Sequence, residues 1–262
     1  VWVQMVLKKQ HETPLFSALK KYVEDKTISF HVPGHKGGKG IAEFRDFVGT
    51  NILAIDVTAG ILDMDTICNP LGIIREAEEL AAEAFGADHA HFLVNGTTSG
   101  IQAMILAVAG PGEEIILPRN AHRSAVGALI LSGVRPVYIK PEIDEYMGIA
   151  MAITPESVRR ALVEHPNAKA VFVINPTYYG VASNLKKIVE IAHSFGKPVI
   201  VDEAHGAHFG FHPDLPPSAM EAGADISAAS VHKLIGSMTQ SSILLVKSEL
   251  VDDRKVKAAM NL

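Results

Sequence analysis

The sequence is poor in cysteine, with Cys68 as the single one among 262 residues. One cysteine excludes an intrachain disulfide framework and fits a reducing compartment, so we expect a cytoplasmic protein. Because a lone cysteine commonly packs as a small apolar residue, we predict that Cys68 is buried rather than a catalytic thiol.

Long apolar runs are lacking as well. No stretch approaches the roughly 20 apolar residues of a membrane span, and the start, VWVQMVLKK, becomes charged too early for a signal peptide. The net charge is only −5 and no basic run occurs, so neither a membrane nor a nucleic acid is an expected partner. Apolar residues still make up 48% of the chain, which is enough for the core of a large α/β domain.

Apolar helical and strand patterns are present and alternate from residue 70 onward. Helices are predicted at residues 13–25, 71–85, 98–109, 122–132, 155–164 and 184–195. Strands are predicted at residues 91–94, 114–118, 135–139, 170–174, 198–201, 225–229 and 242–246. Residues 41–69 show little periodicity, and we expect them to be irregular.

This alternation predicts an α/β fold, a three-layer αβα sandwich around a mainly parallel mixed sheet. The strand at 242–246 follows the strand at 225–229 without room for a full crossover helix. A parallel neighbour needs about a dozen residues of crossover, so strand 242–246 is predicted to be antiparallel.

In such sheets ligands bind beyond the carboxyl ends of the strands, so the residues that follow each strand are site candidates. The segment NGTTSG, 95–100, joins a strand to a helix whose free amides and dipole attract phosphate, and Thr97 and Thr98 add hydroxyl groups. Ordinary helix capping is the alternative. No Gly-Lys-Ser/Thr follows, so this is not a P-loop.

Two other loops offer polar side chains after a strand. His122, in RNAHRS, opens a helix and could stack on a planar ligand, although a solvated or capping histidine is the alternative. In NPTYYG, Asn175, Thr177 and Tyr178 could reach a ligand, although a plain Pro/Gly turn also explains the sequence.

Asp202 and Lys233 are the most informative candidates. Asp202 ends an apolar strand in VDEAHGAH, where a carboxylate is costly without a partner such as a protonated pyridine nitrogen; a structural ion pair or a helix cap is the alternative. Lys233, in SAASVHK, could be a nucleophile in a partly desolvated site, whereas most lysines lie at the surface. A phosphate cradle, a ring stacker, a buried aspartate and a reactive lysine are together the parts of a pyridoxal-5′-phosphate (PLP) site.

DEAHGAH followed by S-x-H-K, with NGTTSG and HVPGHK upstream, resembles the bacterial ornithine/lysine/arginine decarboxylases, which are fold type I PLP-dependent enzymes. The resemblance extends from about residue 11 to the end and favours the shorter branch, which has no N-terminal wing domain. It implies decarboxylation of a basic amino acid, with arginine expected first and then lysine or ornithine. It also implies a homodimer or a larger homo-oligomer.

The resemblance assigns roles to residues at matching positions. It implies that Lys233 holds the cofactor as a Schiff base, that Asp202 pairs with the pyridine nitrogen, and that His232 completes the catalytic set. The other implied contacts are ring stacking by His122, phosphate binding by Thr97, Thr98 and Ser230, a place near the phenolic oxygen for His205, and a place facing the substrate for His232.

The resemblance also implies a domain organisation. We predict an N-terminal helix and Gly-rich arm over residues 1–40 and a PLP-binding major domain over residues 41–262, with the small C-terminal domain of the family absent from this chain. The loop HVPGHKGG, 31–38, is a structural loop or lies near the active site or dimer interface. Candidates for binding the basic end of the substrate are Asp63, Asp65, Glu142 and Glu145.

Three other functions remain open from the sequence. One is another PLP reaction on this fold, such as transamination or lyase chemistry, and another is a non-catalytic fragment of such an enzyme. The third is a metal-dependent hydrolase, because His205, His208 and His212 would share one face of a helix, although the glycines and proline among and beside them argue against that helix.

Overall fold

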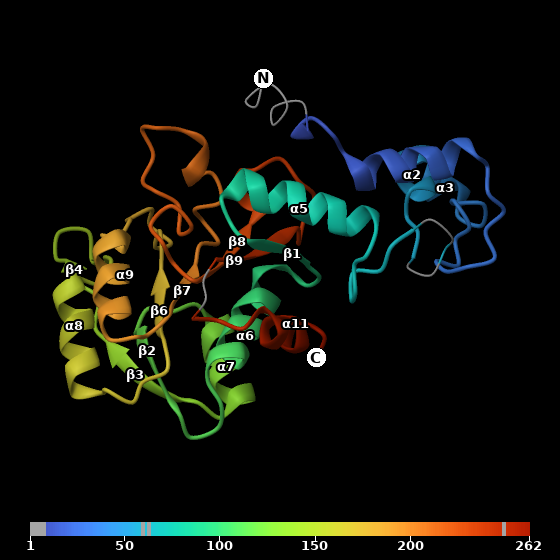
Figure 1. Ribbon diagram of the computed structural model, residues 1–262. Helices are drawn as coiled ribbons and strands as arrows, with labels where there is room; N and C mark the ends of the chain where they lie inside the picture. Colours follow the sequence, from blue (N-terminus) through green and yellow to red (C-terminus); the bar gives the residue numbers. More distant parts are fainter. Residues whose placement is uncertain (1–8, 59–60, 62–63, 248–249) are drawn as a thin grey trace. The chain divides into compact units, whose positions relative to one another are not determined.

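The computed structural model describes residues 9–58, 61, 64–247 and 250–262 (Figure 1). The chain divides into two compact units, Val1–Ala84 and Phe85–Leu262, and each is described by itself. The two units are defined by the contacts within each of them and not by function. The domain boundary expected at residue 40 therefore stays a prediction.

The first unit contains short helices and one long one. They are α2 (Pro14–Glu24), α3 (Ala42–Val48), α4 (Thr50–Ala54) and α5 (Ile73–Phe85). The helices predicted at 13–25 and 71–85 are confirmed. The expectation that residues 41–69 are irregular is wrong, because α3 and α4 lie there. Both are short and bury almost no side chain, so they leave no apolar stripe in the sequence.

Cys68 lies in a turn that the amide of Asn69 closes on the carbonyl oxygen of Thr66. Its side chain is exposed, so the prediction of a buried cysteine is wrong. Connecting segments run over the surface of a protein, and Cys68 lies in such a segment.

The HVPGHKGG loop is held by contacts within its own unit. The hydroxyl of Tyr22 lies 2.7 Å from Nε2 of His31, and Nζ of Lys36 donates to the carbonyl oxygen of His31. Gly38 has φ +84°, and a Cβ there would lie 2.7 Å from Cδ1 of Leu53. The loop therefore has a structural role in this unit, and its expected place near an active site or dimer interface stays a prediction.

Asp65 caps helix α5 with its carboxylate. The side chain accepts hydrogen bonds from five backbone amides, those of Thr66, Leu71, Gly72, Ile74 and Arg75. Burial raises the pKa of Asp65, but these amide hydrogen bonds outweigh it and lower the pKa to about 2. Asp65 is thus a helix cap in this unit, and its proposed contact with a substrate stays a prediction.

The second unit is built on a seven-stranded sheet in the order β1-β9-β8-β7-β6-β2-β3. Its strands are β1 (His89–Leu93), β2 (Glu114–Pro118), β3 (Arg135–Ile139), β6 (Val171–Ile174), β7 (Val199–Asp202), β8 (Ile226–Ser230) and β9 (Ser242–Val246). Each lies within two residues of its predicted range. The pairs formed by β2, β3, β6, β7 and β8 are parallel, whereas β9 is antiparallel to both β8 and β1. The prediction for residues 242–246 is confirmed.

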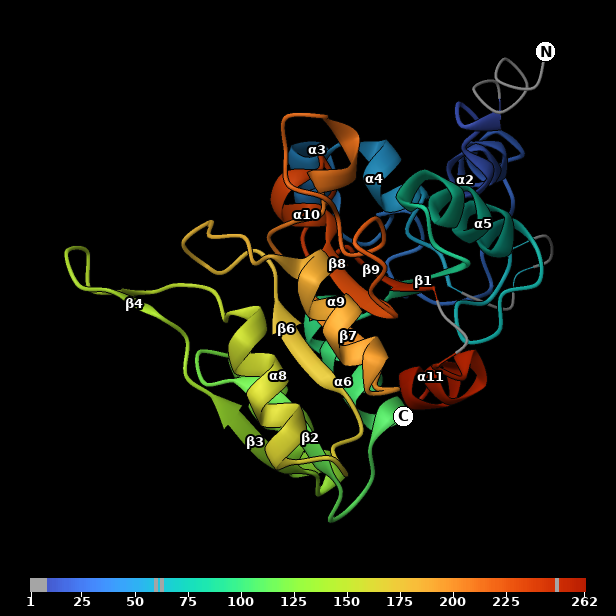
Figure 2. The ribbon, with the colours of Figure 1, turned by 60° about the vertical axis from the view of Figure 1, so that its left-hand side comes forward.

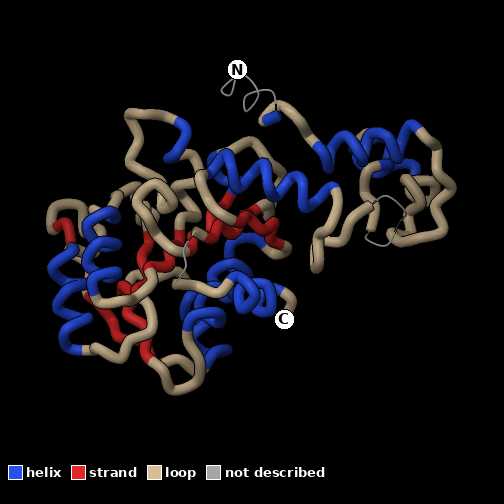
Figure 3. The backbone as a smooth tube through the Cα atoms, in the orientation of Figure 1, coloured by secondary structure: helices blue, strands red, loops and turns tan. Residues whose placement is uncertain are grey.

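Helices cover both faces of this sheet (Figures 1 and 3). Helices α8 (Pro155–Glu164) and α9 (Leu185–Ser194) pack on one face, and α6 (Gly96–Val108), α7 (Arg123–Ser132) and α11 (Asp253–Met260) lie on the other. A buried cluster that includes Met104, Ile115, Phe172 and Leu244 fills the space between α6, α7 and the strands. The three-layer αβα sandwich is confirmed.

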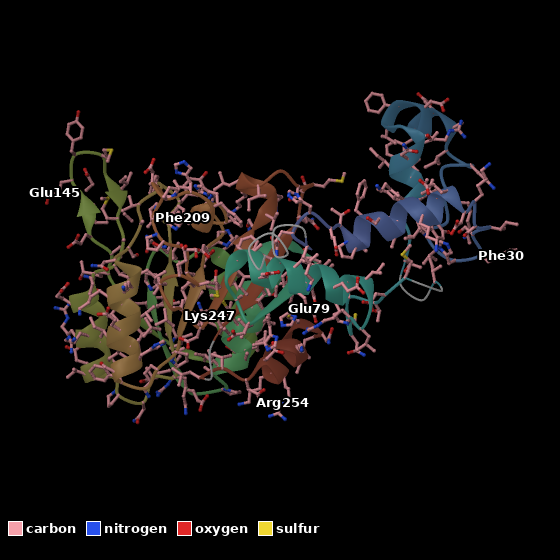
Figure 4. All side chains as sticks on the ribbon, turned by 45° about the horizontal axis from the view of Figure 1, so that its top comes forward. Phe30, Glu79, Glu145, Phe209, Lys247 and Arg254 are labelled. Atoms are coloured by element: carbon pink, nitrogen blue, oxygen red, sulfur yellow. The ribbon has the colours of Figure 1, made fainter. Side chains whose placement is uncertain are left out.

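A small hairpin, β4 (Ile143–Asp144) with β5 (Ile149–Ala150), extends away from the main sheet (Figure 2). Figure 4 labels Glu145 on this hairpin, far from the strands of the main sheet. Strands of two residues are too short to show an alternating pattern, so the sequence did not predict them.

No helix in the described part of the chain is long and apolar enough to cross a membrane.

The cap on α5 leads to a stability prediction. The Asp65→Asn substitution replaces one acceptor oxygen by an amide group that faces backbone donors, and we expect a loss of about 2 kcal/mol of unfolding free energy at pH 7. The folded-state pKa is depressed, so the contribution of Asp65 is present above about pH 4 and is lost as the pH falls toward about 2. Urea unfolding of the full-length protein from pH 7 to pH 2 measures both effects.

The matched control is Glu76→Gln, because Glu76 lies exposed in the first turn of the same helix. We expect this change to cost less than about 0.5 kcal/mol. Equal effects of the two substitutions would contradict the capping role of Asp65.

Candidate active site

A cavity of about 510 Å³ opens at the carboxyl ends of the strands of the second unit. Its lining contains all eight side chains predicted for the site, namely Thr97, Thr98, His122, Asp202, His205, Ser230, His232 and Lys233. The structure therefore brings these residues to one place, while their individual roles stay predictions.

Strand topology explains this convergence. Strands β1, β2, β6, β7 and β8 all run in one direction, so the residues that follow them meet at the same edge of the sheet. Asp202 is the last residue of β7, Ser230 is the last of β8, and Lys233 follows in the short helix α10 (Val231–Leu234).

Hydroxyl groups line the cavity at the N-terminus of α6. The hydroxyl of Thr97 lies 2.8 Å from that of Ser242 and also contacts that of Ser230. Free amides at a helix N-terminus together with hydroxyl donors form a site for an anion such as phosphate. Ser242 was not among the predicted residues, because it begins a strand and the prediction considered only residues that follow one.

Asp202 places a buried carboxylate in the cavity. Its side chain is 4% exposed, and its Oδ1 accepts a hydrogen bond of 3.1 Å from the amide of Ala204. Burial raises the pKa of Asp202, while the amide of Ala204 and the positive charges of His122 and Lys233 oppose that rise. A cation placed in the cavity beside this carboxylate would favour its ionised form.

Lys233 lies at the mouth of the cavity. Its residue is exposed, and its Nζ lies 3.2 Å from Nε2 of His205. Burial lowers the pKa of His205, and the charges of Lys233 and His122 lower it further, so the neutral imidazole is favoured. The ring of Tyr178 lies edge-on to that of His205, with centroids 5.5 Å apart.

The two other histidines have tautomers set by their hydrogen bonds. Nδ1 of His122 accepts from the amide of Ser124 at 3.2 Å, so its proton is on Nε2. Nδ1 of His232 lies 2.9 Å from the carbonyl oxygen of Ser241, which can only accept, so Nδ1 carries the proton. In the neutral tautomer of His232 the lone pair is therefore on Nε2.

Glu203 is a second buried carboxyl group, directly after Asp202, that does not line the cavity. Its oxygens accept hydrogen bonds of 2.7 Å from the amide of Ala219 and from the hydroxyl of Ser227. Burial raises the pKa of Glu203 to about 8, since those two hydrogen bonds do not offset it and the charges of Glu221 and Asp202 add to it. Glu203 links the end of β7 to β8 and to the segment before residue 220.

Some predicted contacts belong to the scaffold instead. The side chain of Asn175 is buried and its Oδ1 accepts from the amide of Ser183 at 2.8 Å, so it stabilises its own loop. Thr177 and Tyr178 from the same loop do line the cavity.

The metal-site alternative lacks its structural basis. The segment 203–212 forms turns and a single 3₁₀ helix, η1 (Phe209–Phe211), so the helix that would align its three histidines is not formed. Across the described ranges, no group of three or more histidine, cysteine, aspartate or glutamate side chains is arranged to hold a metal ion.

Glu142 and Glu145, two of the acids considered for a basic substrate, are not among the described residues that line the cavity. Glu142 and Glu145 are exposed on the β4–β5 hairpin, although Ala150 of that hairpin does line the cavity. Asp63 lies outside the described residues. Among the cavity-lining residues that the structure describes, Asp202 is the one carboxylate.

The fold and the cavity define an α/β protein of the class that includes amino-acid decarboxylases and aminotransferases. The structure matches Escherichia coli constitutive lysine decarboxylase with a TM-score of 0.81 and 26% identity, over 95% of this chain and 37% of that one. It matches N-succinyldiaminopimelate aminotransferase from Mycobacterium tuberculosis with a TM-score of 0.60 and 19% identity, over 95% of this chain and 57% of that one, which shows the shared fold alone.

Residues 13–262 match the family described as "Orn/Lys/Arg decarboxylase, major domain", and the chain belongs to this family. It is 55% identical over 254 residues to an arginine decarboxylase from Bacillus subtilis (strain 168). That alignment covers 97% of this chain and 52% of the relative, so the chain spans about half the length of that relative.

Glu203 gives a prediction about pH. The folded state holds its proton to about pH 8, whereas the unfolded state releases it near pH 4.5. The unfolding free energy should therefore fall by about 1.4 kcal/mol per pH unit across this window. Glu203→Gln keeps an acceptor for the amide of Ala219 and does not titrate, so this part of the pH dependence should disappear. Urea unfolding of the full-length protein at pH 5, 6, 7 and 8 measures it.

The control is Glu190→Gln, because Glu190 is exposed and its pKa is lowered by a hydrogen bond from Lys187, outside this pH range. Its stability curve should run parallel to that of the unmodified protein. If Glu203→Gln also gave a parallel curve, Glu203 would be ionised in the folded state and the assignment would be wrong.

Proposed function

We propose that this chain is the cofactor-binding part of a PLP-dependent decarboxylase that converts a basic amino acid, arginine first, into the corresponding amine and carbon dioxide. The observation that carries the proposal is the convergence of Lys233, Asp202 and the hydroxyl groups around Thr97 in one cavity. We place arginine before lysine because of sequence identity. The chain is 55% identical to the arginine decarboxylase from Bacillus subtilis and 26% identical to the constitutive lysine decarboxylase from Escherichia coli.

The residues of the cavity fit PLP in chemical type. An aldehyde needs an amine, and Lys233 offers one; a pyridine nitrogen needs a carboxylate, and Asp202 offers one that is buried with a raised pKa. A phosphate needs donors, which the N-terminus of α6 supplies with Thr97, Thr98 and Ser230. His122 would cover one face of the ring.

When bound, PLP supplies an electron sink for the pair left behind as carbon dioxide departs. Asp202 would keep a proton on the pyridine nitrogen, because its buried carboxylate is stabilised by an adjacent positive charge. The hydrogen bond from the amide of Ser124 to Nδ1 would hold the orientation of the His122 ring. His232 would use Nε2 to move a proton at the substrate's α-carbon.

The described residues of the cavity supply binding groups for the cofactor but no second carboxylate for the basic end of the substrate. Asp202 is its one carboxylate within the described residues, and Lys233 remains exposed. A homodimer or larger homo-oligomer would bring further groups to this open side. The homo-oligomer is part of this proposal. So are a PLP-binding major domain at residues 41–262 and a cytoplasmic location.

The first test measures carbon dioxide release by the full-length protein from arginine, lysine and ornithine. We expect more carbon dioxide from arginine than from the other two, and covalent cofactor trapped by borohydride on the peptide that contains Lys233.

In Lys233→Ala both the carbon dioxide release and the trapped cofactor should be lost, because no other lysine lines the described cavity. Lys186→Ala, on the exposed side of α9, should retain both. Keto-acid product without carbon dioxide would indicate transamination and refute the proposal.

The second test addresses the carboxylate. Asp202→Asn keeps the shape and the acceptor for Ala204 but removes the charge that holds a proton on the ring nitrogen. We expect turnover to fall more than tenfold, a barrier increase above about 1.4 kcal/mol. Asp214→Asn, a change of an exposed aspartate on the surface, should leave turnover unaltered. A fall of less than tenfold in Asp202→Asn would show that Asp202 does not serve this role.

A further inference from the structure

Three hydroxyl groups from distant parts of the chain meet beneath the cavity. Thr97 lies in the first turn of α6, Ser230 ends β8, and Ser242 begins β9. Thr97 is the central member, because its Oγ1 contacts both serine hydroxyls. Thr97 and Ser230 line the cavity, whereas Ser242 lies behind them.

Burial fixes the direction of the hydrogen bond between Ser242 and Thr97. The residue Ser242 is 3% exposed, and the hydroxyl of Thr97, at 2.8 Å, is the one side-chain partner that the described residues give it. If Thr97 donated to Ser242, the proton of Ser242 would be buried without an acceptor, which is unfavourable. Ser242 therefore donates and Thr97 accepts.

This direction leaves the proton of Thr97 for another acceptor. A hydroxyl has one proton and two acceptor lone pairs. In Thr97 one of these lone pairs already accepts the proton of Ser242, so the proton of Thr97 does not point at Ser242. The proton is then available to the cavity or to Ser230, and the hydroxyl of Ser230 can also donate into the cavity. The contact between Thr97 and Ser230 uses one of their two protons, so one hydroxyl proton remains for the cavity. An anion at this position would receive that donor in addition to the amides at the start of α6.

We propose that Ser242 is a positioning residue for the phosphate group of the cofactor, acting by donating to Thr97 so that the hydroxyl proton of Thr97 faces the cavity. This inference rests on the proposed function. Ser242 does not touch the phosphate itself, and its contribution reaches the anion only through Thr97.

The position of Ser242 is a consequence of the antiparallel strand. Ser242 is the register partner of Leu93 in β1 and of Ser230 in β8, so it is held between the two strands that lead to the other hydroxyl groups. Backbone pairing on both sides of β9 fixes its Cα, and the short distance to Thr97 follows from this ladder.

The test compares PLP with pyridoxal, which has the same ring and aldehyde but no phosphate. Affinities are measured by titrating the full-length apoprotein and following the absorbance of the bound ligand. Ser242→Ala should weaken PLP binding by about three- to tenfold and leave pyridoxal binding within twofold. A serine that served only packing would weaken both ligands equally, and that result would overturn the proposal.

The route through Thr97 is tested by a double-mutant cycle. Thr97→Val removes the hydroxyl and keeps the shape, so adding Ser242→Ala to it should cause no further loss of PLP affinity. An undiminished loss in this background would overturn the proposal. Ser132→Ala is the matched control, because Ser132 is a buried serine of α7 that bonds only local backbone groups and lies outside the cavity.

Ser242→Cys provides a second variant of similar size with a much weaker donor, and circular dichroism identifies the variants that are folded. A folded cysteine variant should show the same selective loss for PLP. If the unmodified protein binds no PLP and borohydride traps nothing at Lys233, the proposed function fails; if it binds PLP and Ser242→Ala or Ser242→Cys binds it equally well, only the present inference fails.

Discussion

The site depends on one constraint, which is the common direction of the parallel strands. Since β7 and β8 end at the same edge of the sheet and β1 leads there into α6, a carboxylate, hydroxyl groups and an amine meet although more than 130 residues separate Thr97 from Ser230 and Lys233. Backbone hydrogen bonds between the strands hold this edge, so the distances within the cavity are set mainly by the sheet and less by its loops.

Two adjacent buried carboxyl groups show how surroundings separate chemical roles. Asp202 faces the cavity with a single amide donor and nearby positive charges, so a cation beside it stabilises its charge. Glu203 points away, has two donors and negative neighbours, and holds its proton to about pH 8. Burial raises the pKa of both, and the difference in partners decides that one serves the cavity while the other ties the strand end to its neighbours.

Much of the fold could be predicted from the sequence, because long amphipathic helices and apolar strands leave periodic patterns. The strands at 114–118, 135–139 and 242–246 have their predicted bounds, and the short link before 242–246 required the antiparallel direction that β9 shows. The helices α3 and α4 and the β4–β5 hairpin were missed, since such short elements show no periodicity. Cys68 was assigned to the interior by residue type, yet its turn places it at the surface.

The sequence by itself determined the family, the order of the layers and the eight residues that share the cavity. Thr97, Thr98, His122, Asp202 and Lys233 follow predicted strands, whereas Ser230, His205 and His232 came from the resemblance of their motifs to the family. Only the tertiary structure decided how they are held. The contact of Ser242 with Thr97, the burial of Glu203, the use of Asp65 as a cap and the tautomers of His122 and His232 depend on groups distant in sequence or on hydrogen-bond direction. Such contacts arise when strands pair and loops close, and no local pattern records them.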